Sequence, residues 1–173
     1  MKQITFRRIG INEAGVLRRL ATETFDKAFA HLNKPENMKA YMDKAFDIGQ
    51  LTTELTNEHS LFYFALVNDE VAGYIKLNFH EAQTDIHDPH SLEIQRIYVK
   101  PEFQNLRIGE KMLRIARKTA LERALQYIWL GVWESNPKAI RFYERNGFQK
   151  IGEHPFQFGD DPQTDYIMRS EVS

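Results

Sequence analysis

The spacing of apolar and polar residues divides the chain into short strands and helices. Over residues 4–9 the apolar positions alternate loosely, which predicts a first strand. Over residues 11–31 they recur at roughly helical spacing, which predicts a helix with one buried face. A second helix is expected over 35–46, because proline is well tolerated at the first position of a helix, and a third short helix or turn over 50–57.

Two strongly apolar segments in the middle of the chain predict a hairpin. Residues 60–67 and 70–79 are rich in aromatic and β-branched residues, and the Asn-Asp pair between them is typical of a tight turn. The polar segment after them predicts a loop. Residues 91–100 form the next expected strand, which ends at Pro101 because proline cannot donate to a strand ladder.

The last third of the chain continues this alternation. Apolar residues four apart predict a helix over about 108–124, and YIWLGVW at 127–133 is typical of a buried strand. The Asn-Pro pair at 136–137 favours the start of another helix, which Gly147 is expected to end. Two final strands are predicted at 148–152 and 164–170.

The order of these elements predicts the fold class. It runs β, two or three helices, then β-β-β-α-β-α-β-β. Such an order combines hairpins with two strand–helix–strand crossovers, so we expect a mixed sheet covered by helices on both faces. No linker or repeat interrupts the chain, and residues 1–173 are expected to form a single domain.

Composition narrows the classes of function. The chain has no cysteine, which excludes a disulfide framework and a Cys nucleophile and suits a cytoplasmic location. The N-terminal segment lacks the apolar core of a signal peptide, and no run has the length of a membrane span, so no membrane partner is expected. The formal net charge of −1 provides no basic field for nucleic acid. A small molecule is the expected partner.

The turn QNLRIG at 104–109 joins an expected strand to an expected helix. Backbone N–H groups in the first turn of a helix have no internal partner, and the helix dipole favours an anion there. Arg107, Lys111 and Arg114 crowd the same end, although the dipole alone would favour acids. The turn is therefore either a phosphate-binding loop or an ordinary turn whose charged residues are solvated.

The segment GVWESNPKAIRFYERNGF contains a second candidate. Asn136 has a sufficient role as a helix cap. Ile140 and Phe148 suffice to dock so short a helix, and Phe142 and Tyr143 are adjacent and cannot share one direction. One of the two rings is expected to leave the core, and a Tyr143 hydroxyl directed into a cleft is one of the two outcomes.

Together these segments resemble the GCN5-related N-acetyltransferase (GNAT) superfamily. The resemblance implies an α/β (α+β) fold with a mixed, mostly antiparallel central sheet. The superfamily's phosphate loop has Gln or Arg, two residues, Gly, one residue, and Gly or Ala, which fall here on Gln104, Arg107 and Gly109. The residues that match its later signature are Asn136, Ala139, Tyr143 and Gly147-Phe148.

Several further segments resemble the PaiA-type polyamine N-acetyltransferases. They are ETFDKAFAHLNKPENMKAYMDKAF, SLEIQRIYVK, IWLGVWE and GDDPQTDYIM. This resemblance covers nearly the whole chain. It implies transfer of the acetyl group of acetyl-CoA to a primary amine of a small molecule, in particular a polyamine such as spermidine or spermine. The amine would attack directly in a ternary complex.

The resemblance also implies where acetyl-CoA binds. Its pantetheine arm would pair with the strand residues Ile97, Tyr98 and Val99, and Asn136 and Tyr143 would help to hold it. A strand N–H would stabilise the oxyanion of the tetrahedral intermediate, an interaction typically worth roughly 3 kcal/mol. The pyrophosphate would lie on the N–H groups of Gln104, Asn105, Leu106, Arg107, Ile108, Gly109 and Glu110.

Arg107 departs from the family pattern, which usually has glycine at this position. Glycine lets the backbone approach a phosphate closely or adopt an unusual φ. Arg107 therefore either adopts an ordinary conformation or bears a cost of about 1–2 kcal/mol in the left-handed region. Its guanidinium could partly offset that cost by lying near a phosphate of CoA.

Two residues are implied in catalysis. Glu93, eleven residues before Gln104, matches the carboxylate base of some members and would accept the amine's proton, directly or through water. The alternative is a structural ion pair with Arg96 or a neighbouring strand. Tyr143 would donate a proton to the departing thiolate, because an ordinary phenol, with a pKa of about 10, and an ordinary thiol, with a pKa of about 8.5, are close enough for the transfer.

A cationic acceptor favours a cleft with acids and aromatic rings. Phe25, Phe29 and Tyr41 are candidates to cover such a cleft. The candidate acids occur in segments expected to be loops, where they are otherwise simply solvated. They are Glu81, Asp85, Asp88, Asp160, Asp161 and Asp165.

Other interpretations stay open on the same scaffold. The acceptor is alternatively an amine of a protein or peptide, or the chain is a weakly catalytic regulator that binds acetyl-CoA. Many members of the superfamily are dimers, so a homodimer is an alternative to a monomer, although no apolar stripe identifies an interface. No metal is expected, because no carboxylate–histidine spacing accompanies the loop histidines His80, His87 and His90.

Overall fold

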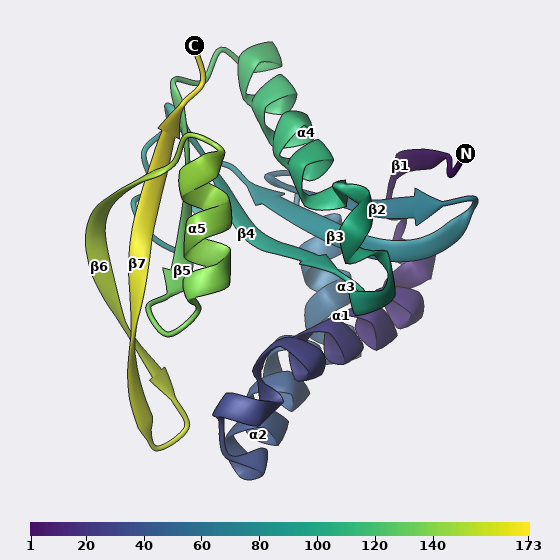
Figure 1. Ribbon diagram of the computed structural model, residues 1–173, viewed down its shortest axis with the longest axis vertical. Helices are drawn as coiled ribbons and strands as arrows, with labels where there is room; N and C mark the ends of the chain where they lie inside the picture. Colours follow the sequence, from purple (N-terminus) through teal and green to yellow (C-terminus); the bar gives the residue numbers. More distant parts are fainter.

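The computed structural model describes all 173 residues and contains one seven-stranded sheet (Figure 1). The strands are β1 (Ile4–Arg8), β2 (Ser60–Val67), β3 (Glu70–Asn78), β4 (Ser91–Val99), β5 (Tyr127–Trp133), β6 (Gln149–Phe158) and β7 (Asp161–Glu171). The helices are α1 (Ala14–Phe29), α2 (Pro35–Ala45), α3 (Ile48–Thr56), α4 (Ile108–Glu122) and α5 (Pro137–Arg145). Short 3₁₀ helices are η1 (Ile11–Glu13), η2 (Ala30–Leu32), η3 (His80–Ala82) and η4 (Pro101–Leu106).

The strand order is β1-β2-β3-β4-β5-β7-β6, and every neighbouring pair is antiparallel except β4 and β5. The parallel pairing of β4 with β5 is short and joins residues 91–93 to residues 127–129. Beyond this point the two strands diverge, as Figure 1 shows. The facing edges of β4 after Glu93 and of β5 after Trp129 therefore carry backbone groups with no strand partner on that side.

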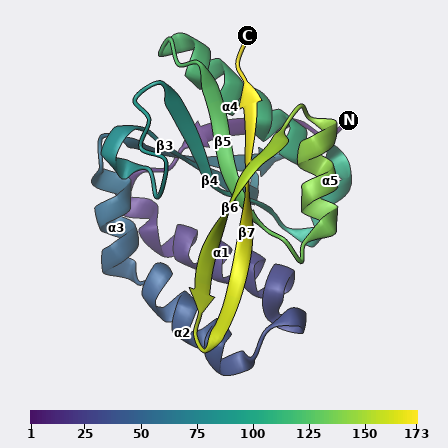
Figure 2. The ribbon, with the colours of Figure 1, turned by 90° about the vertical axis from the view of Figure 1, so that its left-hand side faces the viewer.

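Two hydrophobic cores cover the two faces of the sheet. The first core packs α4 and α5 against one face through residues such as Ile108, Met112 and Tyr143. The second packs α1, α2 and α3 against the other face through Leu17, Met38 and Leu51, among others. In Figure 2, turned by 90°, the hairpin β6–β7 runs down in front of α1 to the level of α2. The predicted mixed, mostly antiparallel sheet with helices on both faces is confirmed.

Local signals placed most elements correctly. Strands β2 and β5 have the predicted bounds, and the hairpin turn between β2 and β3 places Asn68 and Asp69 at positive φ, as a tight primed turn requires. Asn136 caps α5 by accepting a hydrogen bond from the N–H of Ala139. Gly147 follows that helix with a φ of 90°, which favours glycine.

The C-terminal strands are much longer than predicted. β6 and β7 form a continuous hairpin over residues 149–171, whereas only its outer segments showed a strand pattern. The tip of the hairpin packs on α2, where Asp160 accepts hydrogen bonds from Lys34 and Asn37. A Cβ on Gly159 would lie 2.1 Å from Oδ1 of Asn37, so this contact needs a glycine.

The prediction that one ring of the Phe142–Tyr143 pair must leave the core is wrong. Tyr143 belongs to the core beneath α5, and Phe142 packs against that same core from its edge. Gly109 provides the space, because a Cβ there would lie 3.0 Å from Cζ of Phe142. The two rings contact each other edge to face at a centroid distance of 5.4 Å. Two adjacent residues therefore pack on the same core, Tyr143 inside it and Phe142 at its edge.

Candidate active site

A cavity of about 300 Å³ lies between the sheet and the helices α1 and α2. Alternate residues of three strands reach into it, because side chains two apart on a strand point to the same face. From β5 these are Trp129, Gly131 and Trp133. From β6 they are His154, Phe156 and Phe158, and from β7 they are Gln163, Asp165 and Ile167.

A β-bulge changes the alternation on β4. Lys76 of β3 pairs with Arg96, and the next residue, Leu77, pairs with Ile94. Gln95 is the extra residue, so Gln95 and Arg96 both line the cavity although they are consecutive. The bulge therefore brings a neutral amide and a guanidinium to the same wall, and Glu93 keeps its place on that wall two residues earlier.

Glu93 is 3% exposed and lies at the start of the divergence between β4 and β5. Its Oε1 accepts hydrogen bonds from Nδ2 of Asn78 (2.9 Å) and from the backbone N–H of Thr84 (2.8 Å). Its Oε2 accepts the hydroxyl of Thr84. Glu93 forms no ion pair, so the alternative of a structural pair with Arg96 is wrong. The three neutral donors therefore hold both oxygens of this buried carboxyl in place at the wall of the cavity.

Arg96 is matched instead by Glu54 of α3. Oε1 of Glu54 lies 3.2 Å from Nη1 of Arg96 and 2.6 Å from Nζ of Lys76. All three side chains are largely buried, and burial lowers the pKa of Lys76 to about 8. The Arg96 guanidinium also lies over the ring of Phe46, 5.2 Å from its centroid. The carboxylate of Glu54 is thus shared between two cations at this end of the cavity.

Two further acids line the cavity. Asp85, in the loop after η3, pairs with Nδ1 of His154 at 2.8 Å. Asp165, on β7, forms no ion pair, and burial raises the pKa of its carboxyl above the usual value, an effect that His154 partly opposes. The lining therefore carries three carboxylates and one guanidinium, so its fixed charge is negative.

Aromatic rings cover the cavity from the helices. Phe25 and Phe29 of α1 and Tyr41 of α2 all line it, as predicted. Phe25 stacks on Tyr41 at a centroid distance of 4.6 Å, and Phe29 contacts Trp133 at 6.2 Å. These contacts extend the aromatic wall from the helices to β5.

Of the six acids considered for the lining of the cleft, two line the cavity and four do not. Asp85 and Asp165 line the cavity, and Asp165 lies in β7, within the strand predicted over 164–170. Asp161 also lies in β7, at its first residue, and accepts a hydrogen bond from Gln163. Asp88 accepts the hydroxyl of Tyr127. Glu81, Asp88, Asp160 and Asp161 do not line the cavity.

The sequence reasoning missed several residues of this site. Thr84 and Asn78, which hold Glu93, carried no local signal, because their partner lies on another strand. Phe156 and Phe158, which form one wall of the cavity, were not predicted because β6 was expected to end at residue 152. Alternation of these two phenylalanines before the Gly-Asp pair at 159–160 was a signal that could have found it.

Tyr143 lies on the other side of the sheet from Glu93, in the core beneath α5. Burial raises the pKa of its hydroxyl well above the ordinary value for tyrosine. Burial raises the pKa of Tyr98, whose side chain lines the cavity, and Tyr143 adds a small contribution to that rise. Tyr98 lies on the part of β4 that diverges from β5. Tyr98 and Tyr143 therefore lie on opposite faces of the sheet near the point where the two strands separate.

The N-terminus of α4 presents backbone donors. The N–H of Lys111 bonds to the carbonyl of Arg107, so the N–H groups of residues 108–110 precede the first intrahelical bond, and no side chain caps them. Residues 104–106 belong to η4, and the side chain of Gln104 donates to the carbonyl of Val99 at 3.2 Å. This bond ties the loop to the end of β4.

Arg107 adopts the left-handed conformation, with φ 59° and ψ 30°. Of the two conformations considered for this residue, the costly one is the one observed. Its side chain is exposed. Glycine would adopt this backbone conformation at a lower cost in free energy than arginine does.

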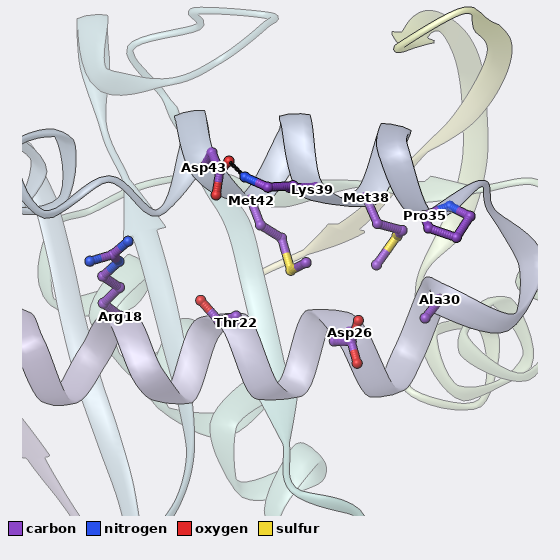
Figure 3. Close-up of a pocket in the computed structure, with 9 residues that line it drawn as sticks. All are labelled: Arg18, Thr22, Asp26, Ala30, Pro35, Met38, Lys39, Met42 and Asp43. Carbon is purple, nitrogen blue, oxygen red and sulfur yellow. Dashed lines mark hydrogen bonds and ion pairs between the residues drawn. The ribbon is translucent and has the colours of Figure 1, made fainter.

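A second cavity, of about 260 Å³, lies in the groove between α1 and α2 (Figure 3). Arg18, Thr22 and Asp26 of α1, and Ala30 at the start of η2, line it at intervals of four residues. From α2 the lining includes Lys39 and Asp43, which form an ion pair with each other. The groove contains neither Glu93 nor Tyr143, and its residues are distinct from those of the larger cavity.

Comparison with known proteins identifies the family. The model of the acetyltransferase (GNAT) family matches residues 22–148. An uncharacterized N-acetyltransferase from Lactobacillus delbrueckii subsp. lactis is 39% identical over 153 residues, which cover 88% of each chain. The chain belongs to the GNAT family. It is therefore an acetyl-CoA-dependent N-acetyltransferase.

Two relatives from Thermoplasma acidophilum extend this similarity. The spermidine N(1)-acetyltransferase is 24% identical over 150 residues, covering 84% of this chain and 88% of the relative. The crystal structure of the PaiA N-acetyltransferase in complex with coenzyme A shares the fold, with a TM-score of 0.80 and 23% identity over 98% of this chain and 99% of that one.

The residues present fit acetyl-CoA as co-substrate. Free N–H groups at the start of α4 suit the pyrophosphate, and Lys111 lies in the same turn. The unpaired edges of β4 and β5 suit an extended arm that pairs with backbone. No three His, Cys, Asp or Glu side chains converge as they would around a metal ion. None of the helices is both long and apolar enough to cross a membrane.

Proposed function

We propose that this acetyltransferase modifies a primary amine of a small polycationic molecule, a polyamine such as spermidine or spermine. The observation that carries the proposal is the lining of the larger cavity, where Asp85, Glu93 and Asp165 outnumber the single guanidinium of Arg96. Because Arg96 is already matched by Glu54, the remaining acids favour a cation. The N-terminal helices, the diverging strands and the C-terminal hairpin all contribute, so we infer that the chain works as a single catalytic domain.

The aromatic lining supports the same class of acceptor. The methylene segments of a polyamine are apolar, and its ammonium groups interact favourably with the faces of aromatic rings. Phe29, Tyr41, Trp133 and Phe156 provide such faces around the acids. The similarity to the spermidine N(1)-acetyltransferase of Thermoplasma acidophilum agrees with this choice.

The proposed reaction is a direct attack within a ternary complex. The neutral amine nitrogen attacks the acetyl carbonyl carbon, a C–N bond forms, and Glu93 accepts the proton that the nitrogen loses, directly or through a water molecule. A backbone N–H of residues 97–99 donates to the oxyanion of the tetrahedral intermediate. The C–S bond then breaks. Tyr143 donates its phenolic proton to the thiolate, which gives the N-acetylated amine and free CoA thiol.

The proposed roles follow from how the two groups are held. Because the carboxylate of Glu93 is held by neutral donors and by no cation, no ion pair has to break before the amine reaches it. Because burial raises the pKa of Tyr143, its hydroxyl stays protonated near neutral pH and can act as an acid. We propose that the co-substrate is bound by Ile97, Tyr98, Val99, residues 104–110, Asn136 and Tyr143.

A thiol-release assay over an amine panel tests the proposal. We expect spermidine with acetyl-CoA to release free thiol, and we expect Glu93→Gln and Tyr143→Phe each to lower kcat by about 100-fold or more, the usual contribution of a general acid or base. Glu93→Gln, which lies outside the proposed co-substrate contacts, should bind acetyl-CoA with the affinity of the wild type by calorimetry. Wild-type rates from both variants would exclude the proposed acid and base.

The same assay distinguishes the alternative functions. Turnover of peptides without turnover of any polyamine would identify a peptide amine as the acceptor. Binding of acetyl-CoA without thiol release over the whole amine and peptide panel would identify a regulator that senses acetyl-CoA.

A further inference from the structure

Asp165 is the acid of the larger cavity that no hydrogen bond or ion pair holds. Among the other acids there, Asp85 is paired with His154, and Glu93 is held by three donors. Asp165 has neither an ion pair nor a side-chain hydrogen bond, and it is the one unmatched carboxylate of the lining. A half-buried carboxylate with no hydrogen bond and no ion pair favours a ligand that supplies the opposite charge.

The surroundings of Asp165 suit an ammonium group. Asp165 pairs in register with Trp133 on β5 and with His154 on β6, so its carboxylate lies beside the indole ring that contacts Phe29. Gly131, the neighbouring cavity residue of β5, has no side chain, and a Cβ there would lie 3.8 Å from Oδ2 of Asp165. The carboxylate is therefore open to the cavity on that side.

Asp165 lies far from Glu93 along the sheet. Glu93 is paired with Trp129 of β5, whereas Asp165 is paired with Trp133, four residues further along the same strand. At about 3.3 Å per residue, the backbones of Trp129 and Trp133 are about 13 Å apart along the strand, and the Asp165 carboxylate leans back as far as Gly131. Glu93 and Asp165 also lie on opposite sides of β5, on β4 and β7. The head of one short amine cannot contact both carboxylates at once.

We propose that Asp165 binds a second, non-reacting ammonium group of the acceptor and so makes the enzyme selective for di- and polyamines over amines with a single positive charge. The proposal rests on the proposed function, because it places the reacting nitrogen at Glu93. The opposite end of the cavity gives no equivalent subsite, since Arg96 and Lys76 already share Glu54.

Kinetics with matched pairs of acceptors tests this inference. Each α,ω-diamine is compared with the amino alcohol of the same chain length, in which a neutral hydroxyl replaces the distal ammonium. For wild type we expect kcat/KM to favour the long diamines by about 10- to 100-fold, the size of a buried charge-assisted hydrogen bond. Asp165→Asn should abolish that preference through KM and leave kcat within about threefold, because the reacting end is unchanged.

Glu153→Gln is the matched control. Glu153 is an exposed acid that precedes His154 on β6 and does not line the cavity, and its replacement removes the same charge. We expect this variant to keep the wild-type preference. Unchanged affinity of Asp165→Asn for acetyl-CoA by calorimetry establishes that the variant is folded.

The outcomes separate this inference from the proposed function. If wild type uses amino alcohols as well as diamines, or if Asp165→Asn weakens both alike, acetyl transfer to small amines stands and the role of Asp165 is overturned. If no di- or polyamine releases thiol and peptides do, the proposed acceptor and the role of Asp165 both fail.

Discussion

Thr84 donates two hydrogen bonds to Glu93, one from its backbone N–H to Oε1 at 2.8 Å and one from its hydroxyl to Oε2. The two residues come from different segments, the loop after η3 and the strand β4. Both oxygens of the proposed base are thus oriented by one residue. The loop that carries Thr84 also carries Asp85, whose pair with His154 joins it to the C-terminal hairpin.

Replacing Thr84 tests how this contact affects the reaction. Thr84→Val removes the hydroxyl and keeps the backbone donor, so Oε2 of Glu93 loses the bond that orients it while Oε1 stays held. We expect kcat to fall by about 3- to 10-fold, the size of one lost hydrogen bond. Thr84→Ser, which retains the hydroxyl, should match wild type. An unchanged kcat for Thr84→Val would argue against a role of the hydroxyl in positioning Glu93.

The burial of Tyr143 predicts the alkaline behaviour of the enzyme. Because burial raises the pKa of this phenol above the ordinary value of about 10, the protonated form that acts as an acid persists through pH 10. We expect kcat of the wild type to show no fall between about pH 8 and 10, and Tyr143→Phe to lower kcat by a similar factor at each pH.

Tyr127 provides a control for that experiment. Its hydroxyl donates to Asp88 and does not face the cavity, so Tyr127→Phe should keep the wild-type kcat. A wild-type rate that falls with a midpoint near the ordinary tyrosine value, with no such fall in Tyr143→Phe, would contradict the prediction.

The left-handed conformation of Arg107 predicts the effect of restoring glycine. Arg107→Gly should raise the free energy of unfolding by about 1 kcal/mol, because glycine adopts this conformation without a Cβ penalty. Affinity for acetyl-CoA, measured by calorimetry, should stay the same or improve. Ala124→Gly is a control at a second residue with positive φ, 54°, which should gain stability without any change in affinity.

A loss of affinity of tenfold or more in Arg107→Gly would have a different meaning. It would show that the guanidinium of Arg107 is itself a ligand of the co-substrate, in addition to the backbone of the loop.

The close approach of β3 to β4 makes Gly73 sensitive to substitution. A Cβ on Gly73 would lie 2.3 Å from the backbone oxygen of Tyr98 and 3.1 Å from Cα of Val99, so the strands would have to separate. We expect Gly73→Ala to lower the free energy of unfolding by about 2 kcal/mol or more, measured by urea denaturation, and to weaken acetyl-CoA binding. The affected backbone is the segment proposed to pair with the pantetheine arm.

Gly152→Ala is the control for a glycine of the sheet. A Cβ added to Gly152, which belongs to β6, would have no atom within 4 Å. The stability and affinity of this variant should therefore remain those of the wild type. Equal stability of Gly73→Ala and Gly152→Ala would contradict the role assigned to the close approach.

Much of this protein followed from local signals in the sequence. The apolar runs 60–67 and 127–133 predicted two strands, and Asn136, Pro137 and Gly147 predicted the limits of α5. These predictions succeeded because strand patterns, helix caps and turn conformations depend on residues a few positions apart. The two family signatures, at 104–109 and 136–148, could be recognised for the same reason, because each lies within one short segment.

Only the tertiary structure decided the form of the site. The bulge at Gln95, the support of Glu93 by Thr84 and Asn78, and the ion pair of Arg96 with Glu54 all join segments distant in sequence. The hairpin that carries Asp165 extended beyond its local pattern because its tip packs on α2. Burial and pairing of charges arise from contacts between elements, and such contacts leave no periodic trace in either partner's own sequence.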